Sequence, residues 1–155
     1  MTLLARAMLA FLLLPGTVAF LVPLLLLAPR GPGSFANVSA LIPLVVGIGL
    51  LLWCVREFYV AGRGTLAPWT PPLELVETGP YRFSRNPMYV AVLLVLCGWA
   101  WGFRSWFLTL YGVMIAAAFF LRVVFFEEPW LARTHGWKWL HYKARVPRWI
   151  WWRSG

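Results

Sequence analysis

The stretch Gly79–Tyr89, with the sequence GPYRFSRNPMY, is a polar run between two apolar blocks in a chain that is 61% hydrophobic. Its glycine and two prolines predict a turn that leads into a helix. Pro87 suits the first turn of that helix, where its missing N–H has no partner to lose. Because hydrocarbon offers no partner to an unpaired backbone group, we expect the run to lie at a membrane surface or to line a cavity. The chemistry of the protein is therefore predicted to lie here.

The composition around this run predicts an integral membrane protein. The 155 residues have a mean hydropathy of +0.73, only 12% are charged, and the length suits a single domain over 1–155. The net charge of +9 comes from basic residues that lie between and after apolar segments. Such residues indicate orientation in a membrane and contact with anionic headgroups, so no nucleic-acid partner is expected. Cys54 and Cys97 lack the spacing of a disulfide framework or a metal site.

We predict an all-α fold with about four transmembrane helices. Residues 1–60 hold the first two, residues 61–86 form an ordered loop, and residues 87–126 form a helical hairpin. Residues 127–155 mix tryptophan with basic residues, which is typical of an interfacial amphipathic segment. The four apolar spans are 7–29, 35–55, Pro87–Trp101 and Ser105–Phe126.

Single residues refine these helices. Pro15 and Pro23 predict kinks in the first helix, and Ser105 is a predicted N-cap of the fourth. Gly47 and Gly49 predict close helix packing. The run Glu127-Glu128-Pro129 predicts the start of a new helix, because acidic side chains and proline are favoured in a first turn.

The charges also predict the topology. Only Arg30 and Arg104 fall on one side of a four-helix arrangement, so both termini are expected to be cytoplasmic, in a bacterial plasma membrane or a membrane of the ER type. The loop 61–86, the turn and the C-terminal segment then share one cytoplasmic face. A cleaved signal peptide is the competing interpretation of the first span, but that apolar run is too long and lacks a convincing cleavage site.

A resemblance starts from the pattern G-P-Y-x-x-x-R-[H/N]-P-x-Y in the Gly79–Tyr89 stretch. Later in the chain come Glu127-Glu128, then Gly136, Tyr142 and Arg145-Val146-Pro147. In order and spacing, residues 62–150 resemble the isoprenylcysteine carboxyl methyltransferase family and its relatives among phospholipid methyltransferases. The resemblance implies methyl transfer from S-adenosyl-L-methionine to a membrane-embedded lipid or lipidated substrate. It also implies that the C-terminal segment covers a cofactor pocket at the cytoplasmic face.

The resemblance also implies the site residues. Asn86 stands where the family often has His, and this amide can form hydrogen bonds but cannot titrate. The family can place a substrate-side Arg at the position of Val123, and this chain has Arg122 one step earlier, which on an α-helix is a rotation of about 100°. We therefore take Arg122 as the candidate substrate contact, and no residue is predicted to be catalytic. The predicted cofactor residues are Leu73, Glu74, Leu75, Val76, Tyr81, Asn86, Pro87, Met88, Tyr89 and Glu127.

Several alternatives remain open at this point. Beyond the glutamate pair and His141 the chain offers no clear base, which favours a carboxylate nucleophile, as in isoprenylcysteine methylation, over an amine. N-methylation of an aminophospholipid and a non-catalytic scaffold or transporter subunit are the other functions considered. Glu127 and Glu128 could cap a helix, and the tyrosines could be interfacial anchors. His135 and His141 have no helical ligand spacing, so we expect interfacial residues and no metal.

Overall fold

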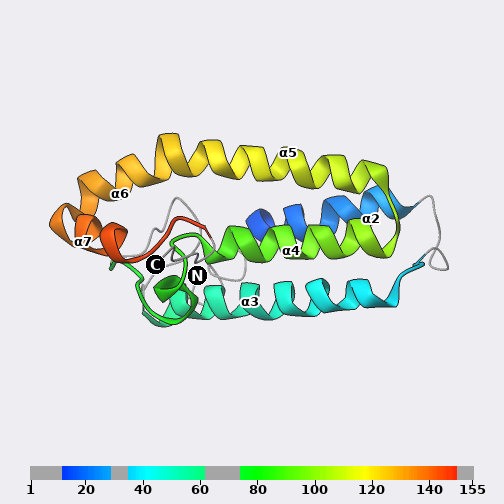
Figure 1. Ribbon diagram of the computed structural model, residues 1–155, viewed down its shortest axis with the longest axis horizontal. Coiled ribbons are helices and arrows are strands. Elements are labelled where there is room, and N and C mark those ends of the chain that lie inside the picture. Colours follow the sequence, from blue (N-terminus) through cyan, green and yellow to red (C-terminus); the bar gives the residue numbers. More distant parts are fainter. Residues whose placement is uncertain (1–11, 29–34, 62–73, 150–155) are drawn as a thin grey trace, which may run out of the picture.

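The computed structural model describes residues 12–28, 35–61 and 74–149, and these residues form helices and turns without a β-strand (Figure 1). The prediction of an all-α fold is confirmed for this part of the chain. The α-helices are α2 (Val22–Leu27), α3 (Leu41–Val60), α4 (Pro87–Gly102), α5 (Trp106–Arg122), α6 (Glu128–His135) and α7 (Trp137–Arg145). Short 3₁₀ turns cover Val38–Ala40 and Gly79–Arg82, and π-helical stretches cover Leu12–Leu21 and Val123–Glu127.

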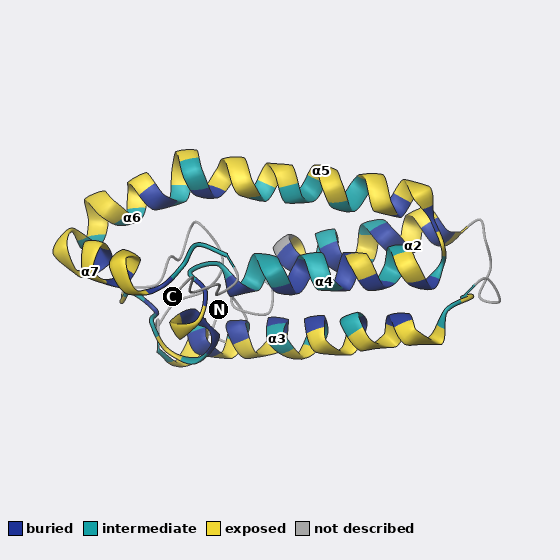
Figure 2. Cartoon of the chain, in the orientation of Figure 1, coloured by how far each residue is buried: buried dark blue, intermediate teal, exposed yellow. Residues whose placement is uncertain are grey.

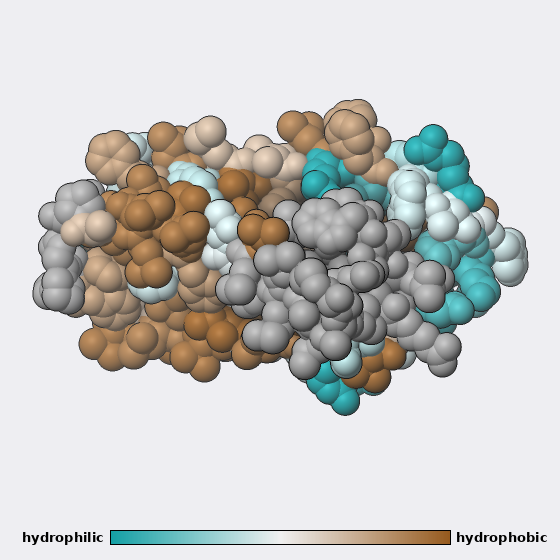
Figure 3. Space-filling model, turned by 180° about the vertical axis from the view of Figure 1, so that it is seen from behind, coloured by the Kyte–Doolittle hydropathy of each residue, from teal (hydrophilic) through white to brown (hydrophobic). Residues whose placement is uncertain are grey.

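Two helical stretches are long and apolar enough to cross a membrane. They are Val38–Val60 and Trp106–His135, whereas Pro15–Leu27 and Pro87–Gly102 are apolar but shorter. The outward faces of α3 and α5 are largely exposed (Figure 2), and their exposed side chains include many large apolar ones. Hydrophobic residues cover the bundle away from α6 and α7, while hydrophilic residues gather at the α6–α7 end (Figure 3). This surface fits a chain whose apolar half faces lipid.

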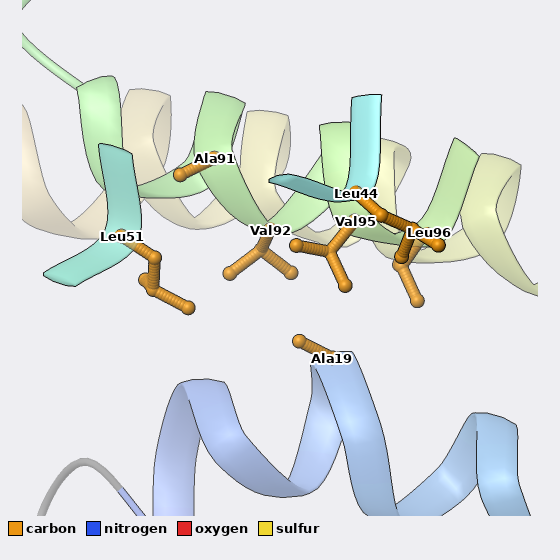
Figure 4. Packing of buried hydrophobic residues seen from close by; sticks show 7 residues of the cluster. All are labelled: Ala19, Leu44, Leu51, Ala91, Val92, Val95 and Leu96. Atoms are coloured by element: carbon orange, nitrogen blue, oxygen red, sulfur yellow. The ribbon is translucent and has the colours of Figure 1, made fainter. Parts of the chain in front are cut away.

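The core of the bundle is centred on α4, which packs against both α3 and α5. Gly47 of α3 allows this approach, since a Cβ there would lie 2.8 Å from Cγ2 of Val95 and 2.9 Å from the carbonyl oxygen of Ala91. The packing prediction is thus confirmed for Gly47. It is wrong for Gly49, where a Cβ would have no neighbour within 4 Å. The buried cluster is shown in Figure 4 and comprises Ala19, Leu44, Leu51, Ala91, Val92, Val95 and Leu96.

The hairpin of α4 and α5 agrees with its prediction. Pro87 occupies the first turn of α4, and Ser105 caps α5 by accepting a hydrogen bond from the N–H of Leu108 at 3.4 Å. The turn between them, at Arg104, lies at the end of the bundle opposite α6 and α7 (Figure 1). The turn that carries Gly79–Tyr89 lies at the α6–α7 end.

The predicted end of the second span at residue 55 is wrong. Helix α3 continues to Val60 and carries Glu57 into the protein, where this residue is only 7% exposed. Thr78 Oγ1 donates to Glu57 Oε2 at 2.6 Å, and Trp53 Nε1 donates to Oε1 at 3.3 Å. Since these donors satisfy the carboxylate inside the protein, the helix need not end where the charge appears.

The prediction that a helix starts at Glu127-Glu128-Pro129 is confirmed in that α6 begins at Glu128 with Pro129 in its first turn. This helix is not separate from the preceding one, however, because the π-helical turn Val123–Glu127 joins α5 to α6 in one continuous stretch, Trp106–His135. In this turn the N–H of Glu128 donates to the carbonyl oxygen of Val123, five residues earlier. A π turn widens a helix locally, which lets it continue past a proline that has no N–H to donate.

The first helix is π-helical over Leu12–Leu21, and Pro15 lies inside that stretch. The structure therefore accommodates Pro15 by a change of hydrogen-bond register, and the kink predicted there stays a prediction. Pro23 lies in the first turn of α2, where proline costs little. Residues 7–11 and 29 of the predicted span lie outside the described residues, as do residues 62–73 of the predicted loop.

Candidate functional site

A cavity of about 820 Å³ opens between the first helix, the polar turn and α5 to α7. This volume is within the range of about 300–1,000 Å³ that is typical of small-molecule sites. Its wall combines polar and charged side chains with a larger set of apolar ones. The polar and charged lining residues include Glu74, Arg85, Asn86, Tyr89, Arg122, Glu127, Arg133 and His135, and the apolar ones include Leu13, Pro15, Val18, Phe119, Phe125 and Phe126.

The cavity brings together most of the residues that the sequence predicted for the site. Arg122, the predicted substrate contact, is among its lining residues. Pro87 is not, because it forms the first turn of α4 behind the wall. Leu73 lies outside the described residues. The predicted cofactor residues that line the cavity are Glu74, Leu75, Val76, Tyr81, Asn86, Met88, Tyr89 and Glu127.

Glu127 is the centre of a polar cluster in the cavity wall. The hydroxyl of Tyr89 donates to Glu127 Oε1, and Arg122 Nε donates to the same oxygen at 2.7 Å. Glu127 Oε2 has no hydrogen-bond partner within the described part of the chain. The ring of Tyr89 stacks on Phe119, with a centroid separation of 4.3 Å. A half-buried carboxylate with one open oxygen beside two aromatic faces is suited to a cationic or hydroxyl-bearing ligand.

The neighbouring carboxylate, Glu128, has a different role. Arg85 Nη1 lies 2.8 Å from Glu128 Oε1, and Arg148 forms a bidentate pair with Glu128 at 2.8 and 2.9 Å. Lys143 Nζ is 3.9 Å from Oε2. Burial lowers the pKa of Arg85, and hydrogen bonds to Glu128 raise the pKa of Arg148. Glu128 therefore joins the turn to the C-terminal segment and is not part of the cavity wall.

Backbone contacts hold the C-terminal segment against the turn. Tyr142 donates its hydroxyl proton to the carbonyl oxygen of Tyr81 at 2.6 Å, and Asn86 Nδ2 donates to the carbonyl oxygen of Arg148 at 2.9 Å. Trp139 is 2% exposed and lies with Tyr142 in a buried cluster on this side of the cavity. Burial raises the pKa of both phenols above the ordinary value, so neither tyrosine serves as a base near neutral pH.

The other candidate donors and ligands lie away from the cavity or at its edge. Arg145 pairs with Glu77 at 2.9 Å, and Arg82 lies over the ring of Phe83 at 4.6 Å. His135 lines the cavity with its ring against Trp130, whereas His141 lies against Trp137 outside the cavity. No group of three potential metal ligands occurs among the described residues.

Sequence reasoning missed the part of the site that lies behind the turn. Gly79 has φ +56°, and a Cβ there would lie 2.7 Å from Cγ of Glu57. The carboxylate of Glu57, held by Thr78, thus fixes the turn just before Tyr81. The Thr-Gly-Pro sequence could have indicated a turn with positive φ, but no local pattern indicates that Glu57 faces it. The contribution of the first helix was missed as well, because a uniformly apolar helix gives no sign of which face it buries.

Helices long and apolar enough to span a bilayer, beside a cavity lined by both polar and apolar residues, are what a helical membrane protein would show. The phospholipid methyltransferase family model matches residues 35–138, which is more than half of the chain. The chain belongs to the phospholipid methyltransferase family, a family of membrane methyltransferases, and the resemblance found in the sequence is confirmed. A search of curated proteins gave no match, and neither did a search of solved structures.

Proposed function

We propose that this protein binds S-adenosyl-L-methionine in the cavity and transfers its methyl group to a lipid or lipidated substrate. The observation that carries this proposal is the composition of the cavity wall. Residues from Glu74–Val76, Tyr81–Tyr89 and Arg122–Glu127, which are distant in sequence, meet there. Apolar residues of the first helix and α5 extend the same cavity, as an amphiphilic substrate requires.

The residues in the wall fit this cofactor. The open oxygen of Glu127 suits a ribose hydroxyl or the ammonium of the amino-acid head, and the rings of Tyr89 and Phe119 suit a sulfonium or adenine. Leu75, Val76 and Met88 supply apolar walls for a base. Arg85 also lines the cavity, so its guanidinium is a candidate donor to the cofactor carboxylate.

When bound, S-adenosyl-L-methionine supplies an electrophilic methyl group that a substrate nucleophile accepts by in-line displacement. The contribution of the chain is alignment and the exclusion of water by the apolar lining. Arg122 is the proposed contact for an anionic group of the substrate, and the exposure of 57% of its side chain supports this role. Asn86 cannot take up a proton, so it orients its neighbours without acting as a base.

The nature of the nucleophile separates two candidate substrates. A carboxylate, as in an isoprenylcysteine, needs no base, and the cavity offers Arg122 to bind it. The family match supports a phospholipid substrate instead. If this phospholipid carries an amine, the amine must lose a proton before it can attack the methyl group. The test is to incubate membranes with methyl-labelled cofactor and then to extract the lipids and proteins. Label in phospholipid indicates phospholipid methylation, whereas base-labile label in a prenylated species indicates a methyl ester.

We further propose four spans with both termini cytoplasmic. Two long apolar helices and two shorter ones support this count. Cysteines placed at the exposed residues Arg82, in the polar turn, and Arg145 should react with an impermeant maleimide from the same side, and a cysteine at Arg104 from the other. Labelling of residues 82 and 145 from opposite sides would rule out the shared site.

The binding proposal is tested by titration calorimetry of S-adenosylhomocysteine into the full chain in detergent. We expect saturable binding at one site. A non-catalytic scaffold or a transporter subunit would bind none, so a flat titration of well-folded protein would contradict the proposed function.

A further inference from the structure

Arg122 and Glu127 are in contact although they are five residues apart. In a regular α-helix each residue turns by about 100°, so residues five apart point about 140° away from each other. Here Arg122 Nε lies 2.7 Å from Glu127 Oε1. The π-helical turn Val123–Glu127 explains the contact, because bonds between residues five apart bring those residues over one another.

Pro129 accounts for the position of this turn. In a regular α-helix its ring would collide with the carbonyl of Phe125, and one backbone hydrogen bond would be lost. A π turn just before the proline relieves both problems. The other π-helical stretch in the described residues, Leu12–Leu21, contains Pro15. Pro87, which lies in a first turn where no bond is lost, has no π turn beside it.

We propose that the π turn is a positioning device for the methyl-transfer site and that Pro129 is the positioning residue that imposes it. The turn holds the guanidinium of Arg122, which faces the substrate, against the carboxylate of Glu127, which faces the cofactor. The same turn sets the direction of Glu128, whose pair with Arg85 anchors α6 to the polar turn. The catalytic consequence rests on the proposed function, whereas the contact itself does not.

The helical register gives a direct test by exchanging two residues. In an α-helix residue 123, four before Glu127, would face the carboxylate, whereas in the π turn residue 122 does. The exchange R122V/V123R keeps the composition but moves the guanidinium to the position of Val123, which is 1% exposed, so V123Q alone serves as the control for a polar side chain at that buried position. In the wild-type chain without ligand, we expect the interaction of Arg122 with Glu127 to change the unfolding equilibrium constant by about threefold. In the exchanged chain we expect this coupling between the arginine and Glu127 to disappear. Double-mutant cycles with Glu127→Gln measure it, and a coupling that is retained or increased in the exchanged chain would overturn the proposal.

The role of Pro129 is tested by deletion and rescue. Deleting Val124 removes the extra residue of the π turn but leaves the ring of Pro129 against a regular helix. We expect this variant to lose methyl transfer about tenfold or more in kcat/KM, since small misplacements of a bound group are costly. The deletion combined with Pro129→Ala forms an uninterrupted α-helix in which residues 122 and 127 are four apart, so activity should return to within about threefold of wild type.

The two failures are distinguishable. Absence of methyl transfer by the wild-type chain in membranes would contradict the proposed function, while the coupling measured without ligand would still report on the turn. If the deletion alone were as active as the deletion with Pro129→Ala, Pro129 would not impose the π turn. If the rescued variant recovered its coupling but not its affinity for S-adenosylhomocysteine, the turn would not position the site.

Discussion

Glu128→Gln tests whether the ion pairs at the α6–α7 end stabilise the protein according to their burial. The side chains of Arg85 and Glu128 are 8% and 10% exposed, so the substitution leaves a buried guanidinium without its counter-charge. Breaking a buried pair in this way costs about 3–5 kcal/mol. We expect about 3 kcal/mol, the lower end, because the glutamine oxygen still accepts one hydrogen bond and Arg148, 32% exposed, reaches solvent.

Glu77→Gln is the matched control. It breaks the pair with Arg145, which has a similar distance of 2.9 Å but side chains that are 57% and 34% exposed. Such a pair contributes about 0.2–1 kcal/mol. Denaturant unfolding in detergent, followed by tryptophan fluorescence, gives both values. Equal losses within about 0.5 kcal/mol would show that burial does not govern these pairs. The double variant R85M/E128L should recover at least half of the loss, because an apolar pair needs no desolvation.

Three further changes follow from the site. Glu127→Ala should abolish binding of S-adenosylhomocysteine while circular dichroism of the helices stays unchanged; retained affinity in folded protein would contradict the assignment of Glu127. Asn86→His should keep binding within about threefold in calorimetry, because a ring N–H can replace the amide donor to the carbonyl of Arg148. Gly79→Ala should cost about 2–4 kcal/mol in the same denaturant assay, since it forces alanine to a positive φ and its Cβ against Glu57; a loss below about 1 kcal/mol would refute this account of the turn.

The sequence was most informative where local chemistry decides the structure. Pro87 and Ser105 start their helices as predicted, because a missing N–H and a capping oxygen act within one turn. The residues of the polar turn were singled out for a similar reason. A polar run between apolar helices must lie at a membrane surface or line a cavity, because hydrocarbon offers its polar groups no partners. The charge topology predicted that the turn and the C-terminal segment share one face, and the family resemblance supplied the particular role of Glu127.

The errors share another cause. The second span was expected to end at Arg56-Glu57 because charge usually marks a boundary, but Glu57 also finds a donor in Thr78, in a different part of the chain. The π turn was missed because a proline after two acidic residues resembles the start of a separate helix. The same sequence also fits a helix that continues through a π turn, and only the structure distinguishes these possibilities. The burial of Trp139, among residues predicted to be interfacial, depends on α7 folding back onto the turn. Long-range partners decide the positions of Glu57 and Trp139, and a local sequence pattern does not identify such partners.

The carbonyl oxygens of Pro147 and Arg148 close one wall of the site by accepting bonds from the N–H of Arg85 and the side chain of Asn86. Any amino acid could offer such an oxygen, so mutational tolerance at these two positions says little about their importance. During synthesis, the helices can insert into the bilayer well before these residues leave the ribosome. The protein is thus expected to become competent for its ligand only after residues 147 and 148 have left the ribosome, and a chain stalled before residue 147 would be inserted but inactive.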